Sequence, residues 1–479
     1  MGLRDYQQDA INQLRLSLAR GNKRPMLQAP TAFGKTKLAG AVVSGALAKN
    51  KRVIFCVPAI DLIDQTVESF RRDGITQIGV LQGSHELTDT RQPVQVASIQ
   101  TLMRRKIPPA DLVVVDEAHR WFDFMARWMA DWNNVPFIGL SATPWTKGLG
   151  KHYDDLIQVT TTAELIERGY LSPFRVYGPS KPDLSKCRTV AGDYNEQDLS
   201  AIMDEPKLVA DVVETWCKNW GADKTLCFAV DRAHARHLAE RFESVGISTG
   251  YVDAFTTREE RAEIREKFHT GEIRVVCNVG CLTTGVDWDV RCIVLARPTK
   301  SEMLYVQIIG RGLRTADGKD SCMILDHTST TENLGFVTEI NHPTLDDGKK
   351  SKSKSQSVKP EKLPKSCPSC TYLKPAGVHA CPACGFAPAK PTALEEAEGK
   401  LIEFTKAGKK RKANKQEFYS ALIGYAKAKD FDPGWCAHTF KDYYGVWPKG
   451  LSREAGPMTQ ECQSYITYKK IKYAHRRQA

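Results

Sequence analysis

Short apolar runs alternate with longer, helix-length segments along most of this 479-residue chain. The runs are rich in valine and isoleucine, and they occur in two successive groups. They are Arg52–Val57, Val94–Ala97, Leu112–Val115 and Phe137–Leu140 in the first group, and Thr225–Val230, Gly250–Val252, Arg274–Asn278 and Cys292–Ala296 in the second. Such alternation is typical of a parallel sheet with helices on its faces. The sequence therefore predicts two α/β domains in tandem.

The segment Gln28–Thr36 reads QAPTAFGKT and stands between a short apolar run and a helical pattern. It matches the phosphate loop G-x-x-x-x-G-K-[ST], except that Ala29 replaces the first glycine. Lys35 would reach the β- and γ-phosphates of ATP, and the Thr36 hydroxyl would bind Mg²⁺. Ala32 stands where related loops often carry glycine, and a left-handed backbone there would cost alanine about 1–2 kcal/mol. The alternative is a chance Gly-Lys-Thr at the start of a helix.

A carboxylate pair follows the run Leu112–Val115, in the tetrapeptide Asp116-Glu-Ala-His119. In open α/β sheets, ligands bind at the carboxyl ends of the strands. Asp116 would hold Mg²⁺ through water, and Glu117 would polarise the water that attacks the γ-phosphate. Taken alone, the pair could cap a helix, and His119 could be a packed, hydrogen-bonded residue. Together with the phosphate loop, the pair predicts hydrolysis of ATP.

A glutamine and two arginines in Gln307-Ile-Ile-Gly-Arg-Gly-Leu-Arg314 are spaced for one face of a helix. Arg311 and Arg314 could then reach phosphates that the first domain holds. An arginine supplied across an interface stabilises the charge of phosphoryl transfer and is worth about 10³–10⁵ in rate. Hydrolysis would thus require closure of the two domains. An exposed amphipathic helix is the alternative, and the spacing does not say which arginine acts directly.

The net charge of +12 is concentrated near the C-terminus. Residues 341–479 hold 26 lysines and arginines against 13 aspartates and glutamates. A basic segment suits a polyanion such as nucleic acid, although a solvated surface is the simpler alternative. No apolar run reaches the roughly 18 residues of a membrane span, and Met1–Ala10 does not resemble a signal peptide. We therefore expect a cytoplasmic protein with reduced thiols.

Residues 341–364 contain a lysine- and serine-rich stretch that cannot bury apolar surface, which predicts a flexible linker. Beyond it, four cysteines form two C-x-x-C pairs; they are Cys367, Cys370, Cys381 and Cys384. This spacing predicts a closed, tetrahedral and structural Zn²⁺ site. A redox-active pair is the alternative, but the surrounding sequence lacks the βαβ unit in which such pairs occur.

The last segment predicts a small helical domain. Phe418, Leu422 and Tyr425 recur at i, i+4 and i+7 and form one apolar stripe. Aromatic residues downstream would close a core around this stripe; they are Trp435, His438, Phe440, Tyr443, Tyr444 and Trp447. Packing is preferred over stacking on single-stranded bases, which would be worth about 1–3 kcal/mol for each base.

The order of these motifs resembles the superfamily 2 helicases and translocases, over roughly residues 3–327. The DEAH form is most similar to type III restriction subunits and to phage replication or recombination helicases. The resemblance implies two RecA-like domains. It also implies that Gln7 would form a hydrogen bond with the adenine edge. The other residues that it places at the nucleotide are Ala29, Thr31, Gly34, Lys35, Thr36, His119, Gly285, Asp287 and Gln307. It further implies Ser141 and Thr143 in coupling the nucleotide state to domain contact, and Pro58, Gln65, Ser98, Gln100, Thr101 and Thr283 at the nucleic-acid backbone.

The predicted organisation is a RecA-like domain over 1–170, a second over 171–340, the linker over 341–364, a zinc ribbon over 365–390 and a basic helical domain over 391–479. The predicted function is an ATP-dependent DNA helicase or translocase of replication, recombination or repair, with ATP, Mg²⁺ and Zn²⁺ as cofactors. Single-stranded or forked DNA is the expected partner, and the tail is a candidate docking segment for replication or recombination proteins. An RNA helicase and an ATP-switched DNA-binding scaffold or loader are the alternatives. Restriction is disfavoured, because we find no clear nuclease signature.

Overall fold

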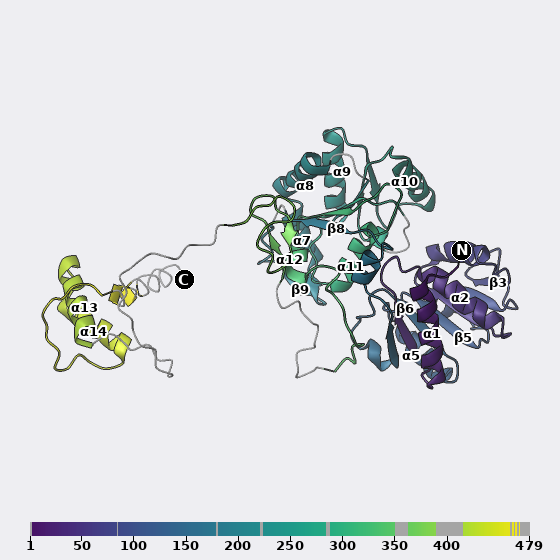
Figure 1. The fold of residues 1–479 in the computed structure, drawn as a ribbon, viewed down its shortest axis with the longest axis horizontal. Coiled ribbons are helices and arrows are strands. Elements are labelled where there is room, and N and C mark those ends of the chain that lie inside the picture. The colour runs from purple at the N-terminus through teal and green to yellow at the C-terminus, as the bar shows by residue number, and fades with distance from the viewer. Residues whose placement is uncertain are drawn as a thin grey trace. The chain divides into compact units, whose positions relative to one another are not determined.

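The computed structural model describes residues 2–83, 85–178, 181–220, 224–283, 288–349, 363–388 and 415–459, together with 462, 463, 465, 466 and 469. The chain forms two compact units, Met1–Ala389 and Lys390–Ala479. The first unit contains both α/β domains and the cysteine-rich segment (Figure 1). Among the described residues, no helix combines the length and the apolar character needed to cross a bilayer.

The first α/β domain is built on a parallel sheet of seven strands. Their order is β3 (Ile78–Leu81), β4 (Val94–Ser98), β2 (Val53–Val57), β5 (Leu112–Asp116), β6 (Phe137–Ser141), β1 (Pro25–Gln28) and β7 (Asp155–Gln158). The helices are α1 (Asp5–Ala19), α2 (Lys35–Leu47), α3 (Ile63–Arg72), α4 (Ile99–Leu102), α5 (Asp123–Asp131) and α6 (Thr162–Glu167), with the 3-10 turns η1 (Ile60–Leu62) and η2 (Leu149–Lys151). Strands β1, β2, β3, β4 and β6 are buried along their whole length, as expected when helices cover both faces.

The second α/β domain repeats the plan with a parallel sheet of six strands. Their order is β12 (Thr249–Val252), β13 (Val275–Asn278), β11 (Thr225–Phe228), β14 (Cys292–Leu295), β15 (Cys322–Asp326) and β8 (Phe174–Tyr177). Its helices are α7 (Glu196–Met203), α8 (Pro206–Trp220), α9 (Arg232–Ser244), α10 (Arg258–Thr270), α11 (Glu302–Gly312) and α12 (Thr330–Leu334), with the 3-10 turn η3 (Cys281–Thr283) and the hairpin β9 (Thr189–Val190) and β10 (Asp193–Tyr194). The predicted pair of parallel-sheet domains is therefore confirmed.

After the second domain, the chain returns to the first through residues 341–349, here called the return segment. The Gly148 amide donates to Asp346 Oδ1 at 2.9 Å, and the Gly150 amide donates to the Asp346 carbonyl at 2.8 Å. Gln158 Nε2 donates to the carbonyl of His342 at 2.7 Å. The predicted linker over 341–364 thus begins with residues that contact the first domain, while residues 350–362 lie outside the described part of the chain.

The cysteine-rich segment packs against the edge of the second sheet. Its short strands β16 (Lys365–Ser366) and β17 (Leu373–Lys374) pair antiparallel. Tyr372 forms an isolated bridge with Tyr177 at the end of the edge strand β8. The Gly178 amide donates to the carbonyl of Thr371 at 3.0 Å, and the Leu373 side chain is buried. This segment is therefore attached to the second α/β domain.

The C-terminal unit has its own small core, formed by α13 (Lys415–Lys429) and α14 (Pro433–Tyr444). Phe418 and Leu422 are fully buried, and Tyr425 is partly buried against them. Phe440 of α14 is also fully buried in this core. The apolar stripe predicted along Phe418, Leu422 and Tyr425 therefore serves packing.

Candidate active site between the two α/β domains

The loop between β1 and α2 has a left-handed backbone at two positions. Gly34 has φ 84° and caps the N-terminus of α2. Ala32 has φ 61°, so it adopts the left-handed conformation whose cost was noted from the sequence. Ala29 is not among the left-handed residues; it is fully buried, and its amide donates to the Ser141 carbonyl at 2.7 Å. The missing first glycine is therefore tolerated because that position packs against β6 and needs no special φ.

A cleft of about 510 Å³ opens beside this loop and is lined by both α/β domains. The first domain contributes Thr31, Ala32, Phe33, Gly34, Lys35, Thr36, Asp116 and Glu117, among others. The second domain contributes Gln307, Arg311, Arg314 and Thr315. The structure thus brings together the predicted loop, the carboxylate pair and the arginines, although Thr31 and Arg314 are 283 positions apart in the sequence.

Lys35 lies between the two carboxylates of the cleft. Its Nζ forms an ion pair with Glu117 Oε1 and lies 3.9 Å from Asp116 Oδ1. Burial raises the pKa of Asp116 to about 6, against the opposing effect of Lys35. Burial would also raise the pKa of Glu117, but the Lys35 ammonium and His119 outweigh it and hold that pKa below its usual range. Glu117 therefore stays ionised well below neutral pH, whereas Asp116 takes up a proton as the pH falls through about 6.

The donor and acceptor groups of the cleft fit a nucleotide with its Mg²⁺. The first amides of α2, at a helix N-terminus without a side-chain cap, suit phosphate oxygens. Glu117 Oε2 is buried, with His119 Nδ1 3.3 Å away, and no described residue completes its acceptor capacity. A buried carboxylate oxygen of this kind accommodates a water molecule. Glu117 itself has a left-handed backbone, with φ 47°, which is a sign of a constrained site.

A hydrogen-bond chain connects the first domain to α11 of the second. Gln307 Nε2 lies 3.2 Å from both His119 Nε2 and Thr143 Oγ1. Because the Gln307 amide donates, His119 Nε2 is the acceptor of this hydrogen bond. The proton of the His119 ring is then on Nδ1, which lies 2.9 Å from Ser141 Oγ. Ser141 Oγ in turn accepts from the Thr143 amide at 3.0 Å. The residues predicted to couple nucleotide state to domain contact are thus in one network, although Ser141 and Thr143 do not line the cleft.

The two arginines differ in their surroundings. Arg311 is 7% exposed, and its Nε and Nη2 donate to the Thr283 carbonyl at 3.0 and 2.5 Å. Arg314 lies beyond Gly312, the last residue of α11, so the predicted single helical face is only partly present. Lys319 Nζ donates to the Gly312 and Arg314 carbonyls, both at 2.6 Å, and so fixes this end of α11.

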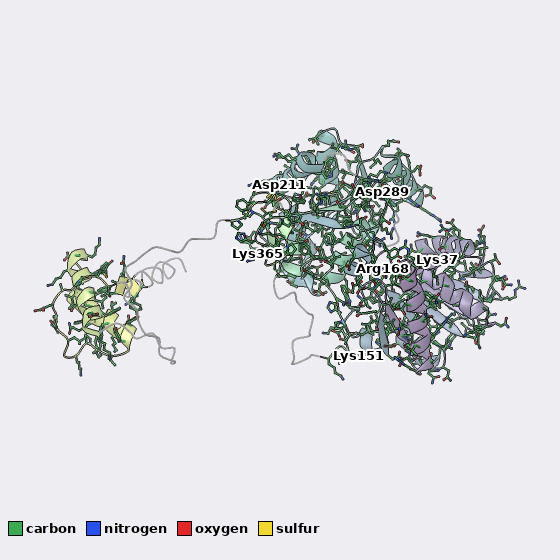
Figure 2. The ribbon with its side chains drawn as sticks, viewed as in Figure 1. Lys37, Lys151, Arg168, Asp211, Asp289 and Lys365 are labelled. Carbon is green, nitrogen blue, oxygen red and sulfur yellow. The ribbon has the colours of Figure 1, made fainter. Side chains whose placement is uncertain are left out.

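The wall of the cleft away from the carboxylates contains residues that the motifs did not indicate. Gln7, predicted to bond adenine, is buried: its Nε2 donates to the Phe33 carbonyl at 2.9 Å, and its Oε1 accepts from the Arg4 amide. Arg4 and Tyr170 line the cleft instead, with the guanidinium 4.7 Å from the ring centroid. Arg168, labelled in Figure 2, lies 5.2 Å from the same ring. Arg4 lies only three residues before Gln7, whereas no sequence signal indicated Tyr170.

The residues predicted at the nucleic-acid backbone fall into separate groups. Gln100 Nε2 donates to the Pro58 carbonyl at 3.3 Å, which joins the loops after β2 and β4. Three predicted hydroxyls have local partners: Ser98 Oγ accepts from the Thr101 amide at 3.2 Å and lies 3.0 Å from its hydroxyl, and Thr283 Oγ1 donates to Gly280 at 2.8 Å. Gln65 lines the nucleotide cleft. Gly285 and Asp287, which were predicted at the nucleotide, lie outside the described residues.

The four cysteine sulfurs of the predicted zinc site lie within 4.8 Å of one another. The Cys367–Cys384 and Cys370–Cys381 sulfur distances are 3.8 and 3.6 Å. Four sulfurs at about 2.3 Å from a tetrahedral Zn²⁺ would be separated by about 3.8 Å. The donor set and its spacing therefore fit Zn²⁺, with all four positions supplied by the protein.

Two family models match the chain: residues 1–146 match "Type III restriction enzyme, res subunit", and residues 208–316 match "Helicase conserved C-terminal domain". A Saccharomyces cerevisiae protein provisionally named ATP-dependent helicase IRC3 is 30% identical over 370 residues, or 72% of this chain and 53% of that protein. A 51.5 kDa protein of a Lactococcus phage is 29% identical over 376 residues, or 75% of this chain and 77% of that protein.

Solved structures show the same fold. A fragment provisionally described as an HsdR subunit of a type I restriction enzyme from Vibrio vulnificus has a TM-score of 0.57 at 21% identity, over 72% of this chain and 69% of the fragment. The chain thus joins a domain that matches the type III restriction res subunit to one that matches a helicase C-terminal domain, and the two fold as RecA-like domains. The chain spans about half the length of the yeast relative.

Proposed function

We propose that this protein is an ATP-dependent DNA translocase or helicase whose two RecA-like domains close on ATP in the cleft between them. Lys35 would hold the β- and γ-phosphates, Asp116 and Thr36 would hold Mg²⁺, and Glu117 would orient and polarise the attacking water. When bound, Mg²⁺ would neutralise charge on the phosphates. Arg311 and Arg314 stabilise the phosphoryl group from the second domain, and Arg4 and Tyr170 flank the base.

The observation that carries this proposal is the composition of the cleft. A phosphate loop and a buried carboxylate pair come from one domain, and two arginines come from the other. Neither half is sufficient alone, because an arginine supplied across the cleft acts only when the domains are together. The cycle of opening and closing is the source of movement. The hydrogen bonds from Gln307 to His119 and Thr143 report the nucleotide state to the second domain.

DNA is the proposed track, and replication, recombination or repair is the proposed setting. The relatives support this proposal, since they include a yeast protein provisionally named a helicase and a phage protein, and a structural neighbour with a TM-score of 0.51 is a restriction-modification enzyme bound to DNA. The four cysteines hold one structural Zn²⁺. The basic C-terminal residues provide a second set of contacts with the phosphate backbone of DNA.

The decisive experiment measures ATP turnover with single-stranded DNA, duplex DNA, RNA or no nucleic acid. We expect DNA to stimulate turnover, Lys35→Ala to abolish it, and Glu117→Gln to bind ATP without cleaving it. Arg311→Ala or Arg314→Ala should lower turnover by orders of magnitude while ATP binding falls much less. Stimulation by RNA alone would favour an RNA helicase, and binding of DNA without stimulation would favour an ATP-switched scaffold. Wild-type turnover in Lys35→Ala would refute the nucleotide site.

A further inference from the structure

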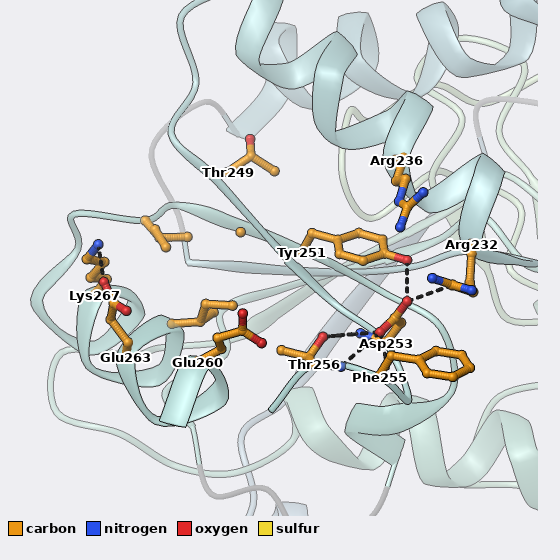
Figure 3. Close-up of a pocket in the computed structure, with 13 residues that line it drawn as sticks. Arg232, Arg236, Thr249, Tyr251, Asp253, Phe255, Thr256, Glu260, Glu263 and Lys267 are labelled. Atoms are coloured by element: carbon orange, nitrogen blue, oxygen red, sulfur yellow. Dashed lines mark hydrogen bonds and ion pairs between the residues drawn. The ribbon is translucent and has the colours of Figure 1, made fainter. Parts of the chain in front are cut away.

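Phe255 has the most exposed ring in the second RecA-like domain among the residues described, at 74% exposure. It is the third residue after the edge strand β12 and lines a pocket of about 510 Å³ that is separate from the nucleotide cleft. Figure 3 shows its ring below Arg232, with Thr256 and Glu260 to the left of it. A phenylalanine this exposed buries little apolar surface and contributes little to folding, so its ring is available for a contact outside the domain.

The loop that carries Phe255 is held rigidly. Asp253 is 3% exposed, and its Oδ1 accepts from the Phe255 amide at 2.8 Å and the Thr256 amide at 3.0 Å. Its Oδ2 accepts from the Tyr251 hydroxyl at 2.9 Å and from Arg232 Nε at 2.7 Å. The aromatic ring is therefore presented on a fixed backbone, which lowers the entropy lost when it contacts a ligand.

Arg232 covers one face of the Phe255 ring, with its guanidinium carbon 4.5 Å from the ring centroid. Because the ring is still 74% exposed, the remaining surface is open to solvent. A cation against one face and an open face opposite suit a flat, electron-rich group such as a nucleobase. Arg232 is itself half exposed despite its ion pair, so a neighbouring phosphate could also reach it.

The position of the loop points to a strand that crosses both domains. Arg258, three residues after Phe255, pairs with Asp64 of the first domain at 2.9 Å. Asp64 follows the loop after β2, where Pro58 is joined to Gln100. The start of α10, three residues after the ring, thus contacts the first domain beside the loop at which backbone contacts were predicted. A single strand gripped there would bring a base to the ring.

We infer that Phe255 is a stacking platform for one base of the bound single strand, at the edge of the second domain. Loops that contact the phosphate backbone bind DNA of any base sequence equally. An aromatic ring that stacks on a base adds affinity that also depends little on which base it is. This inference rests on the proposed function, because it requires a single strand on the motor. It adds a base contact on β12 that is independent of the ATP residues.

The test measures binding of oligo(dT) and of an abasic oligonucleotide of equal length. Phe255→Ala and Phe255→Leu should weaken oligo(dT) binding by about 5- to 100-fold, whereas Phe255→Tyr should keep it. Binding of the abasic strand should be the same for wild type and all three variants. Val245→Ala, which removes another exposed apolar side chain of this domain, is the matched control and should bind like wild type.

Two results would overturn the inference. Equal oligo(dT) affinity in Phe255→Ala and wild type would exclude stacking, while DNA-stimulated ATP turnover of the wild type would leave the proposed function intact. An equal loss on the abasic strand would show that the loop acts through phosphates. If wild-type protein responds in ATP turnover to duplex DNA but does not bind single strands, the platform alone fails. If neither form of DNA binds or stimulates turnover, the proposed function fails together with the platform.

Discussion

Ala32 carries a conformation that alanine adopts only at a cost. Its φ of 61° places Cβ close to the following carbonyl, which costs roughly 1–2 kcal/mol. The neighbouring Gly34 has φ 84° without this penalty. Strain at a phosphate loop persists only where the surroundings fix the backbone, and the burial of Ala29 and Phe33 on either side of Ala32 provides that constraint.

We predict that Ala32→Gly raises the stability of the first domain by about 0.5–1 kcal/mol, because relief of strain exceeds the loss of a half-buried methyl group. The urea midpoint of unfolding should move upward. Ala41→Gly in the middle of α2 is the control and should lower stability by about the same amount, since glycine is unfavourable in a helix. A lower midpoint for both variants would contradict the strain at Ala32.

At the residue scale, the sequence predicted which residues line the cleft better than it predicted their individual contacts. The positions of Lys35, Glu117 and Arg311 followed from residue type and spacing, because phosphate and carboxylate chemistry tolerate few substitutes. The surroundings of Gln7 and Gln65 were predicted less accurately from the sequence. Their surroundings depend on how α1 and α3 pack, and an amide side chain serves a buried backbone carbonyl as well as a ligand.

The cysteine-rich segment has a structural role at the scale of elements. It covers the edge strand β8, whose last residue pairs with Tyr372. Edge strands expose unpaired backbone groups, so such cover protects the second sheet. If Zn²⁺ folds the segment, then the metal also protects that edge, because structural zinc contributes its binding energy to folding.

We therefore predict one zinc per chain, removed by chelation or by Cys381→Ser. Loss of zinc should speed amide hydrogen exchange at Phe174–Tyr177 and leave the opposite edge strand, β12, unchanged. Elemental analysis and exchange mass spectrometry measure both effects. Cys217→Ser changes an exposed cysteine of α8 and should keep the zinc. Zinc-free protein with protected β8 would argue that the segment folds without metal.

Elements with a strong repeating pattern were predictable, and those fixed by single contacts were not. Strands such as β2 and β13 appear as continuous apolar runs because both faces are buried. The return segment has no such pattern. Its position depends on Asp346 meeting two glycine amides far away in the chain, and local sequence carries no information about that encounter.

At the scale of the whole molecule, the basic C-terminal unit is separable from the ATP site. All cleft residues lie within Met1–Ala389, and residues 390–479 hold 18 lysines and arginines against 10 aspartates and glutamates. Removal of residues 390–479 should weaken duplex binding and flatten the dependence of log affinity on log salt by about 0.9 for each lost phosphate contact.

ATP turnover at saturating DNA should survive this truncation, and titrations at several salt concentrations supply the comparison. A shallower dependence of DNA affinity on salt, with intact ATP turnover, would show that the tail binds DNA. An unchanged slope and affinity would instead make the tail a solvated surface or a docking segment for protein partners.

The second RecA-like domain is attached to the first by two neighbouring passages of chain. The connection that follows β7 starts at Gln158, whose amide holds the return segment at His342, and the ring of His342 lies 4.7 Å from that of Trp145. Two adjoining attachments allow the domains to rotate about one hinge axis and oppose sideways displacement. We therefore expect Arg311 to approach the phosphate loop along the same path in every cycle of ATP hydrolysis.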